Sequence, residues 1–447
     1  MTGNSVQQGA GAIGEVLNAL DREELVDLAL SLGNIDSPPG QEQAVSDRIR
    51  EWASEHGLDV RQIGMFPDRQ NVVVQIDGDG SLPSLVFNAH MDTAWGPEER
   101  RWMQRPDDPV YTSAWRDGEI IYGNGVVNDK GPLACALLAL RALRDTGTVL
   151  GGRVMVAGVC GEIGQEPVDE YQGPDYLSKE VGTRFLVEHG VIADFAVVAE
   201  NSDFGVTTVE AGKAFFKISI LGERSVYTPY VQHTERPVEH ANAVVRSTAV
   251  IEWLTDWGRR YESEHTYPFE YGECVPKVSI GAIRAGQPFI PITSPELCFI
   301  YLDVRLTPKQ TAMEVERELR AGLESLGVPV RIECFLYRRG YHAKDADALL
   351  EVLAEAHEEE FARPLGGVTA GQASSWRDTN PYNELGIPAI SYGPSAGRGG
   401  AQSWTRIEDL VSAARMYARI VMGLCVQPGI GTNARSTKVV DERENGS

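Results

Sequence analysis

The sequence predicts an α/β domain into which a smaller α+β unit is inserted. Three observations support this fold class. Three short runs are almost entirely apolar, two amphipathic segments have the length of helices, and the pattern changes between residues 212 and 330. The apolar runs are residues 84–90 (SLVFNAH), 154–162 (VMVAGVCGE) and 194–200 (DFAVVAE). Unbroken apolar strands suit a sheet that is covered on both faces, because a strand with one wet face would alternate apolar and polar residues.

Each of the three predicted strands stops at a residue that can bind a metal or transfer a proton. The runs end at His90, Glu162 and Glu200. In α/β sheets, ligands bind beyond the carboxyl ends of the strands, so these side chains are expected in one pocket. The alternative is that the strands simply end in polar residues where they reach solvent.

The remaining segments of the sequence predict the helices that cover the sheet and the inserted unit. Residues 132–145 and 406–425 are the helices that we expect to cover the sheet. Between 212 and 330, two predicted strands (214–223 and 297–308) and two predicted helices (241–262 and 311–327) are joined by long loops. We therefore expect one domain from residues 1–211 and 331–447, with residues 212–330 inserted as a second domain.

Charge and composition narrow the class of protein. The net charge is −23 and the sequence pI is about 4.8, so we expect no nucleic acid and no membrane among the partners. No run of 18 apolar residues occurs, and the six cysteines are far apart without a C-x-x-C pair. Reduced thiols and a cytoplasmic enzyme are expected.

Motifs in a fixed order carry the chemistry. His90 and Asp92 have H-x-D spacing, which on a strand puts both side chains on one side, so that the carboxylate can orient the imidazole. Then follow GNGVVNDKG (123–131), GVCGEIG (158–164), VVAEN (197–201) and WRDTNPYNELGIPAISYGP (376–394). From about residue 22 to 422 this ordered set resembles the metallopeptidase and deacylase family that contains acetylornithine deacetylase, succinyl-diaminopimelate desuccinylase and glutamate carboxypeptidase.

The resemblance implies a fold and a reaction. It implies a metallopeptidase-like catalytic domain on a mixed sheet, interrupted by a lid or dimerisation domain, and hydrolysis of C–N bonds by water that a metal activates. Position by position, it implies His90 as a metal ligand, Asp92 as its orienting acid, Glu162 as the general base and Glu200 as a further acidic ligand. A shift of the match by one residue would instead make Glu162 a ligand and put Gly161 at the base position.

Three expected ligands of a second metal are absent. Asn128 stands where the resemblance implies a bridging aspartate, Ile163 where it implies a glutamate, and the segment GGAQSWTRIEDL (399–410) lacks the late histidine. A bridging carboxylate neutralises two nearby ions, whereas a single ion accepts an amide oxygen. We therefore expect one divalent ion, Mn²⁺ or Zn²⁺, bound by His90, Glu200 and either Asn128 or Glu162.

Two further residues are candidates for contact with substrate. Tyr227 stands where the resemblance implies a lid histidine that reaches the active site, and His233 is a possible substitute. Arg377 is a candidate clamp for a substrate carboxylate, since a guanidinium meets a carboxylate with two hydrogen bonds. The alternative for Arg377 is a structural ion pair with Asp378 or another carboxylate. Lys130 is expected either to contribute to the site or only to anchor its turn.

The expected function is hydrolysis of a C–N bond in a small carboxylate-bearing substrate. GEIGQEPVDEYQGPDY (161–176), VYTP (226–229) and WRDTN (376–380) resemble a divergent branch of the family that removes the amino group of an aromatic acid such as 5-nitroanthranilate. The alternatives are a one-metal deacylase or dipeptidase that acts on N-acylated amino acids, and a catalytically silent binding protein. The resemblance of the lid implies a homo-oligomer, a dimer or a multiple of it.

Overall fold

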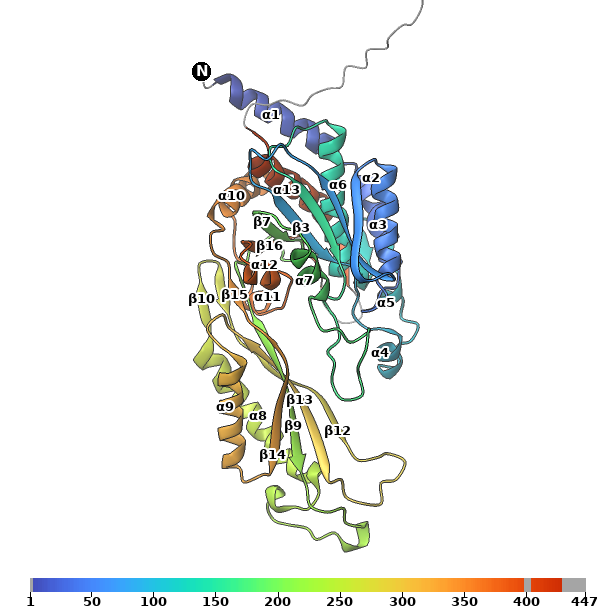
Figure 1. Cartoon of the computed structure of the whole chain (residues 1–447), viewed down its shortest axis with the longest axis vertical. Coiled ribbons are helices and arrows are strands. Elements are labelled where there is room, and N and C mark those ends of the chain that lie inside the picture. Colours follow the sequence, from blue (N-terminus) through green and yellow to red (C-terminus); the bar gives the residue numbers. More distant parts are fainter. Residues whose placement is uncertain (1–2, 398–402, 428–447) are drawn as a thin grey trace, which may run out of the picture.

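The computed structural model describes residues 3–397 and 403–427. The chain forms two domains that lie end to end, a larger domain and the inserted domain, called the lid from here on (Figure 1). The larger domain is built on a six-stranded sheet and the lid on a four-stranded sheet. The expected fold class is confirmed.

The sheet of the larger domain is mixed. Its strand order is β1-β2-β6-β3-β7-β16, in which β6, β3, β7 and β16 are parallel and β1 and β2 run antiparallel at one edge. The bounds are β1 Asp59–Phe66, β2 Arg69–Ile76, β3 Leu85–His90, β6 Val154–Val159, β7 Phe195–Val198 and β16 Ala389–Ser391. Every residue of β3 and β6 is buried, as their unbroken apolar sequences predicted.

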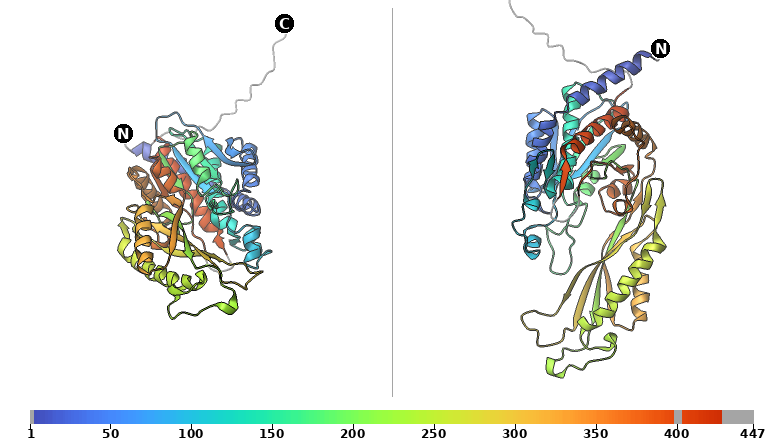
Figure 2. Two further views of the ribbon diagram at one scale, coloured as in Figure 1. Left: turned by 60° about the horizontal axis from the view of Figure 1, so that its bottom comes forward. Right: turned by 180° about the vertical axis from the view of Figure 1, so that it is seen from behind.

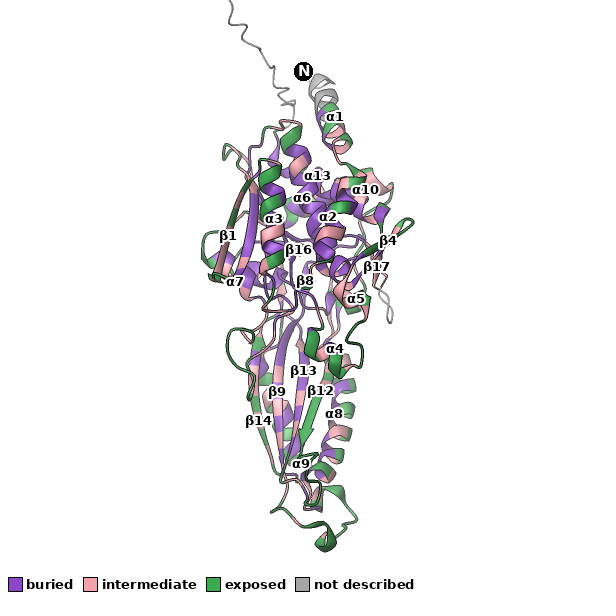
Figure 3. Cartoon of the chain, turned by 90° about the vertical axis from the view of Figure 1, so that its right-hand side faces the viewer, coloured by how far each residue is buried: buried purple, intermediate pink, exposed green. Residues whose placement is uncertain are grey.

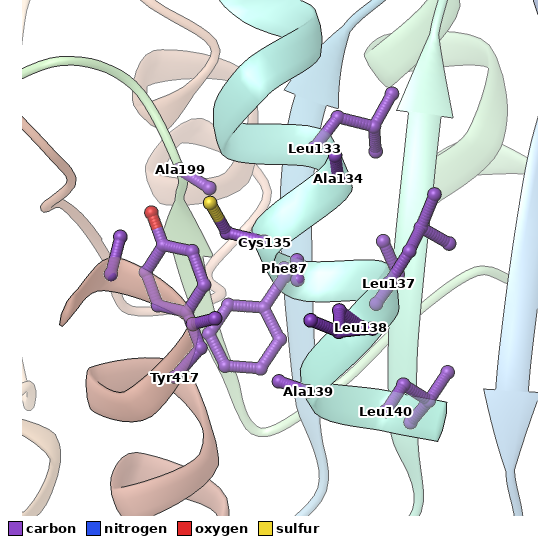
Figure 4. Packing of buried hydrophobic residues seen from close by; sticks show 14 of the residues in the cluster. Phe87, Leu133, Ala134, Cys135, Leu137, Leu138, Ala139, Leu140, Ala199 and Tyr417 are labelled. Atoms are coloured by element: carbon purple, nitrogen blue, oxygen red, sulfur yellow. The ribbon is translucent and has the colours of Figure 1, made fainter. Parts of the chain in front are cut away.

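Helices cover both faces of this sheet. Alternate residues of a strand enter two separate cores: Phe87 and Val156 pack on one face, and Val86 and Met155 on the other. Figure 4 shows Phe87 between α6 and Tyr417 of α13. Full burial of such a side chain contributes about 1.5–3 kcal/mol to folding. The helices of the first face are α2 Arg22–Gly33, α3 Gln43–Glu55, α6 Gly131–Asp145, α10 Asp347–Phe361 and α13 Ile407–Cys425, and those of the second are α7 Val181–Glu188 and α12 Thr379–Glu384.

The lid is an antiparallel sheet with two helices on one face. Its order is β12-β13-β9-β14, and α8 and α9 bury the face that contains Phe216 and Ile300. The bounds are β9 Gly212–Leu221, α8 Ala243–His265, β12 Val278–Ala285, β13 Leu297–Leu306, α9 Ala312–Ser325 and β14 Val330–Arg338. Because β14 pairs with β9 as far as Arg338, the lid continues beyond the predicted boundary at residue 330. The sequence pattern had identified β9 and β13 but neither β12 nor β14. The loops farthest from the larger domain are exposed (Figure 3).

Two short strands carry the chain between the domains. Seen from behind, the two domains again lie end to end (Figure 2). β8 (Val209–Glu210) pairs with β15 (Tyr341–His342). A Cβ atom on Gly212 would lie 2.3 Å from the backbone nitrogen of Gly340, so the close approach of the two crossings requires glycine. Asn380 bridges them, since it accepts a hydrogen bond from the Tyr341 N–H (3.1 Å) and donates one to the Ala211 carbonyl (3.0 Å).

The other elements are short or peripheral. They are α1 Gly3–Asn18, α4 Pro97–Trp102, α5 Pro109–Thr112, β4 Trp115–Asp117, β5 Ile120–Tyr122, an irregular turn Val126–Lys130, 3-10 turns Thr228–Tyr230 and Pro237–Glu239, β10 Tyr267–Phe269, β11 Gly272–Cys274, α11 Ala370–Ala373 and β17 Trp404–Arg406. None of the helices in the described ranges is long and apolar enough to span a membrane. All six cysteines are unpaired, and Cys334 alone is not fully buried.

Candidate metal centre

Three side chains from separate elements converge at the carboxyl end of the larger sheet. His90 is the last residue of β3, Glu200 follows β7, and Asp129 lies in the turn that leads into α6. One ligand atom from each lies within 4.8 Å of the others, and all three residues are buried. The structure therefore brings His90 and Glu200 together as predicted, and it adds Asp129.

Two members of this group have ligand atoms without hydrogen-bond partners. Within the described part of the chain, His90 Nε2 and both carboxylate oxygens of Asp129 have no hydrogen-bond partner, although all are buried. Buried polar atoms without partners cost free energy unless something else binds them. One imidazole nitrogen and carboxylate oxygens are the donors that Mn²⁺ and Zn²⁺ accept, so the group fits a divalent cation.

Asp92 and the backbone hold His90 in the form that a metal needs. The ring nitrogen Nδ1 of His90 lies 2.8 Å from the Asp92 carbonyl oxygen, to which it donates, and 3.5 Å from Asp92 Oδ1. Since Nδ1 carries the proton, Nε2 presents its lone pair to Asp129 and Glu200. Burial opposes protonation of His90, but the Asp92, Asp129 and Glu162 carboxylates raise its pKa well above 6.5, so the ring lies in a strongly negative environment.

Asp92 also fixes the loop that carries the predicted base. Its carboxylate accepts hydrogen bonds from the backbone N–H groups of Glu162 (3.1 Å) and Ile163 (2.8 Å). The Glu162 side chain is 8% exposed and lines the same cavity as Glu200. Burial, and next the negative charge of Glu200, raise the pKa of Glu162 above 4.5, which is the direction that a general base requires. The role of Glu162 as base stays a prediction.

Arg377 lies between two buried carboxylates. Its Nε donates to Glu200 Oε2 (2.9 Å), and its Nη1 donates to Glu210 Oε1 (2.7 Å) and to the Gln372 carbonyl (3.0 Å). Burial raises the pKa of Glu210 to about 8 despite this pairing. The geometry is that of the alternative, a structural ion pair, in which Glu200 and Glu210 are the carboxylates. The clamp role of Arg377 stays a prediction.

The cavity beside the group has a volume of about 500 Å³. Its walls come from both domains and include Asn128, Glu162, Glu200, Lys213 and Trp376. Asn128 is thus at the site, although its role as a ligand stays a prediction. Asp129 was missed because the resemblance assigned the ligand position to Asn128. The only local signal was the carboxylate of Asp129 directly after Asn128, and the turn has no periodicity that shows which of the two side chains points inward.

Tyr227 is not brought to the cavity within one chain. It is 51% exposed, in the loops at the far end of the lid, where its ring lies 6.1 Å from that of Tyr230. His233 is in the same loop region and lies 6.2 Å from the ring of His240. The expected contact of Tyr227 with substrate is therefore absent within a single chain, because the lid sheet separates these loops from the larger domain.

Two other polar residues have structural partners. The Lys130 ammonium donates to the Ile35 carbonyl (2.6 Å), so Lys130 anchors its turn. Asp378 accepts a hydrogen bond from the Thr183 hydroxyl (2.7 Å). The segment 399–410 lacks the histidine that the resemblance implies, and its first four residues, 399–402, lie outside the described residues.

Residues 86–423 match the family described as Peptidase family M20/M25/M40, which is most of the chain. The chain belongs to this family. The match confirms the resemblance that the ordered motifs indicated, and it covers the lid and the larger domain from residue 86 onward.

Curated relatives and solved structures agree with this assignment. The chain is 25% identical over 312 residues to an N-formyl-4-amino-5-aminomethyl-2-methylpyrimidine deformylase of Bacillus subtilis, which covers 67% of this chain and 66% of that protein. It is 25% identical over 198 residues to a succinyl-diaminopimelate desuccinylase of Legionella pneumophila, which covers 43% of this chain and 48% of that protein.

The fold is shared with solved structures of low sequence identity. Human carnosine dipeptidase 1 superposes with a TM-score of 0.65 at 15% identity, over 92% of this chain and 99% of that one. A dinuclear metal-binding peptidase of Bacillus subtilis superposes with a TM-score of 0.59 at 17% identity, over 90% and 97%. The expected class, a hydrolase of C–N bonds with a metal site, is confirmed at the level of the family.

Proposed function

We propose that this chain is a metal-dependent hydrolase that removes the amino group of a small, carboxylate-bearing aromatic amine such as 5-nitroanthranilate and releases ammonia. The observation that carries the proposal is the buried group of His90, Asp129 and Glu200, which contains unpartnered atoms and lies beside the cavity that Glu162 and Glu200 line. A divalent ion held there supplies Lewis acidity that polarises water and substrate.

The ligand set supports one ion. His90 and two carboxylates offer three protein ligands, and Asn128 adds a neutral amide in the same cavity. The side chain of Ile163, at the position where a further acidic ligand was expected, has no donor atom. Two divalent ions close together need more negative charge than this set provides. We propose Mn²⁺ or Zn²⁺, at one ion per chain.

Glu162 is suited to move the proton. In the proposed reaction, water adds to the ring carbon that bears the amino group, and Glu162 takes a proton from that water. The electron pair displaced from the ring is held by the nitro group para to that carbon. Glu162 then gives the proton to the departing nitrogen, so that ammonia leaves and a hydroxyl group remains on the ring. Its burial and the nearby Glu200 give its carboxylate the basicity for both steps.

A second candidate is hydrolysis of an N-acyl amide. The observation in its favour is the similarity to the Bacillus subtilis deformylase, which by its name removes a formyl group from an aminopyrimidine. The same site residues serve both reactions, because each needs a polarised water and a proton shuttle. Only the bond that breaks differs.

We also propose that the chain works in the cytoplasm as a homo-oligomer and binds neither nucleic acid nor membrane. The unpaired, mostly buried cysteines suit a reducing compartment. The exposed position of Tyr227 at the end of the lid is where a second copy can meet it. The net charge of −23 disfavours polyanionic partners.

One assay separates the candidates. Protein loaded with Mn²⁺ is incubated with 5-nitroanthranilate, N-formyl and N-acetyl amino acids and dipeptides, while ammonia and free amine are measured. The metal-free protein and the Glu162→Gln variant are the controls. Ammonia from the aromatic amine alone supports the proposal. Release of free amine from the acylated substrates selects the deacylase, and inactivity on the whole panel selects a binding protein.

A further inference from the structure

A buried lysine without a charged partner lies in the wall of the cavity. Lys213 is the second residue of β9, the first lid strand, and is 1% exposed. Within the described ranges, its ammonium makes no hydrogen bond and no ion pair with any residue. It lies 4.0 Å from the centre of the Trp376 ring. A buried ammonium normally has an anionic partner, and one aromatic face replaces only part of that stabilisation.

Trp376 offers a second donor at the same place. Its side chain is 8% exposed, and its indole Nε1–H is buried without a hydrogen-bond partner in the part of the chain that the structure describes. Buried indole N–H groups usually have an acceptor. Lys213 of the lid and Trp376 of the larger domain thus both line the cavity. Each has a hydrogen-bond donor that no acceptor in the described residues binds.

The neighbouring charges favour an anion from outside the protein. Burial, and next the charges of Lys179 and Arg305, which also line the cavity, lower the pKa of Lys213 well below 10.5. The Glu162 and Glu180 carboxylates raise this pKa, but in the described residues neither forms an ion pair with Lys213. Lys179 donates to the Ile163 carbonyl, and Arg305 pairs with Asp303 at 3.0 Å. The Glu200 carboxylate is bound by Arg377. Among the lysines and arginines of this wall in the described residues, Lys213 alone has no hydrogen-bond acceptor.

We propose that Lys213 and the Trp376 N–H form an anion subsite that binds the carboxylate of the substrate. One ammonium and one N–H match the two oxygens of a carboxylate, each of which accepts a hydrogen bond. The inference rests on the proposed function in one respect: the carboxylate belongs to the molecule whose C–N bond is hydrolysed. It assigns to Lys213 the role that the sequence had suggested for Arg377.

Binding of a simple anion tests the subsite without turnover. Benzoate and benzamide are titrated into the Mn²⁺-loaded protein and followed by calorimetry. The variants are Lys213→Met, which keeps the shape of the cavity wall, and Trp376→Phe, which keeps an aromatic ring and removes the N–H. We expect benzoate to bind more tightly than benzamide. Lys213→Met should weaken benzoate by roughly tenfold to a hundredfold, and Trp376→Phe by about fivefold, with little change for benzamide.

The control is Lys309→Met, in which an exposed lysine that lies 5.2 Å from the Tyr267 ring is replaced outside the cavity. It should leave benzoate binding unchanged. Equal benzoate affinity in the wild type and Lys213→Met would overturn the subsite, as would benzoate binding that requires the metal but ignores both variants. If the subsite binds benzoate while no panel substrate reacts, the subsite stands and the proposed reaction fails. If 5-nitroanthranilate reacts while Lys213→Met binds benzoate normally, the proposed reaction stands and the subsite fails.

Discussion

Replacement of Arg377 by methionine distinguishes the ion pair seen in the structure from the substrate clamp that the sequence suggested. Arg377 is 1% exposed and joins Glu200 and Glu210. Removal of one member of a buried ion pair typically costs about 3–5 kcal/mol, because the remaining charge is left buried. At roughly 1.5 °C per kcal/mol for a domain of about 330 residues, the unfolding midpoint of the metal-free variant should fall by about 4–8 °C.

Metal binding should suffer as well. Arg377 orients Glu200 through the Nε contact, and loss of such a supporting hydrogen bond typically weakens metal affinity by about 10–100-fold. Thermal unfolding with and without Mn²⁺, together with chelator competition, measures both effects. Excess Mn²⁺ should recover part of the lost midpoint, because the ion compensates the charge of Glu200.

The matched control is Arg419→Met. Arg419 also joins two carboxylates, those of Glu359 and Glu360, but it lies on α13 away from the cavity. Glu359 is largely exposed, and the buried Glu360 keeps its ion pair with Arg415, so we expect a smaller loss of stability than in Arg377→Met and no change in metal affinity. An Arg377→Met protein with a wild-type midpoint, wild-type metal affinity and a raised KM would refute this reasoning and establish the clamp.

Three further changes test other parts of the site and the fold. Glu162→Gln should lower kcat by about 10²–10⁴ at unchanged metal content, and near-normal turnover would exclude Glu162 as the base. Asp129→Asn should weaken Mn²⁺ binding by about tenfold or more, since affinity follows the charge of the ligands; a Kd equal to that of the wild type, measured by chelator competition, would remove Asp129 from the site. Burial lowers the pKa of His357 from 6.5 to about 4, so the unfolded chain binds a proton in this range that the folded chain does not, and stability should fall as the pH drops from 6.5 to 4. In His357→Gln the fall in unfolding midpoint over this pH range should be smaller, and an equal fall in both proteins would contradict the assignment.

The strands and the strand-end residues could be predicted because burial dictates their sequence pattern. β3, β6 and β7 are covered on both faces, so their sequences are continuously apolar, and His90 and Glu200 follow where the apolar runs end. Asp129 could not be chosen over Asn128 in this way. Neighbouring residues of an irregular turn have no period that fixes their directions, whereas alternate residues of a strand do.

Lys213 and Arg377 show a second limit of the sequence. The contacts of each come from segments distant in the chain: Lys213 meets Trp376, and Arg377 meets Glu200 and Glu210. No local pattern reports such a pairing. A cation was therefore expected to bind the substrate carboxylate, but the structure commits Arg377 to acidic partners and leaves the ammonium of Lys213 without one.

The position of Lys213 couples the proposed anion subsite to the arrangement of the domains. Lys213 follows Gly212 at the first crossing and belongs to the lid, whereas Trp376 and the residues of the metal centre belong to the larger domain. A carboxylate held by both donors would link the lid to the larger domain, while a metal held by His90, Asp129 and Glu200 would contact only the larger domain. Any movement of the lid would thus change the distance between the two groups that hold the substrate. Binding of a substrate of the right length should therefore favour one lid position, and a substrate without the carboxylate should lack this constraint.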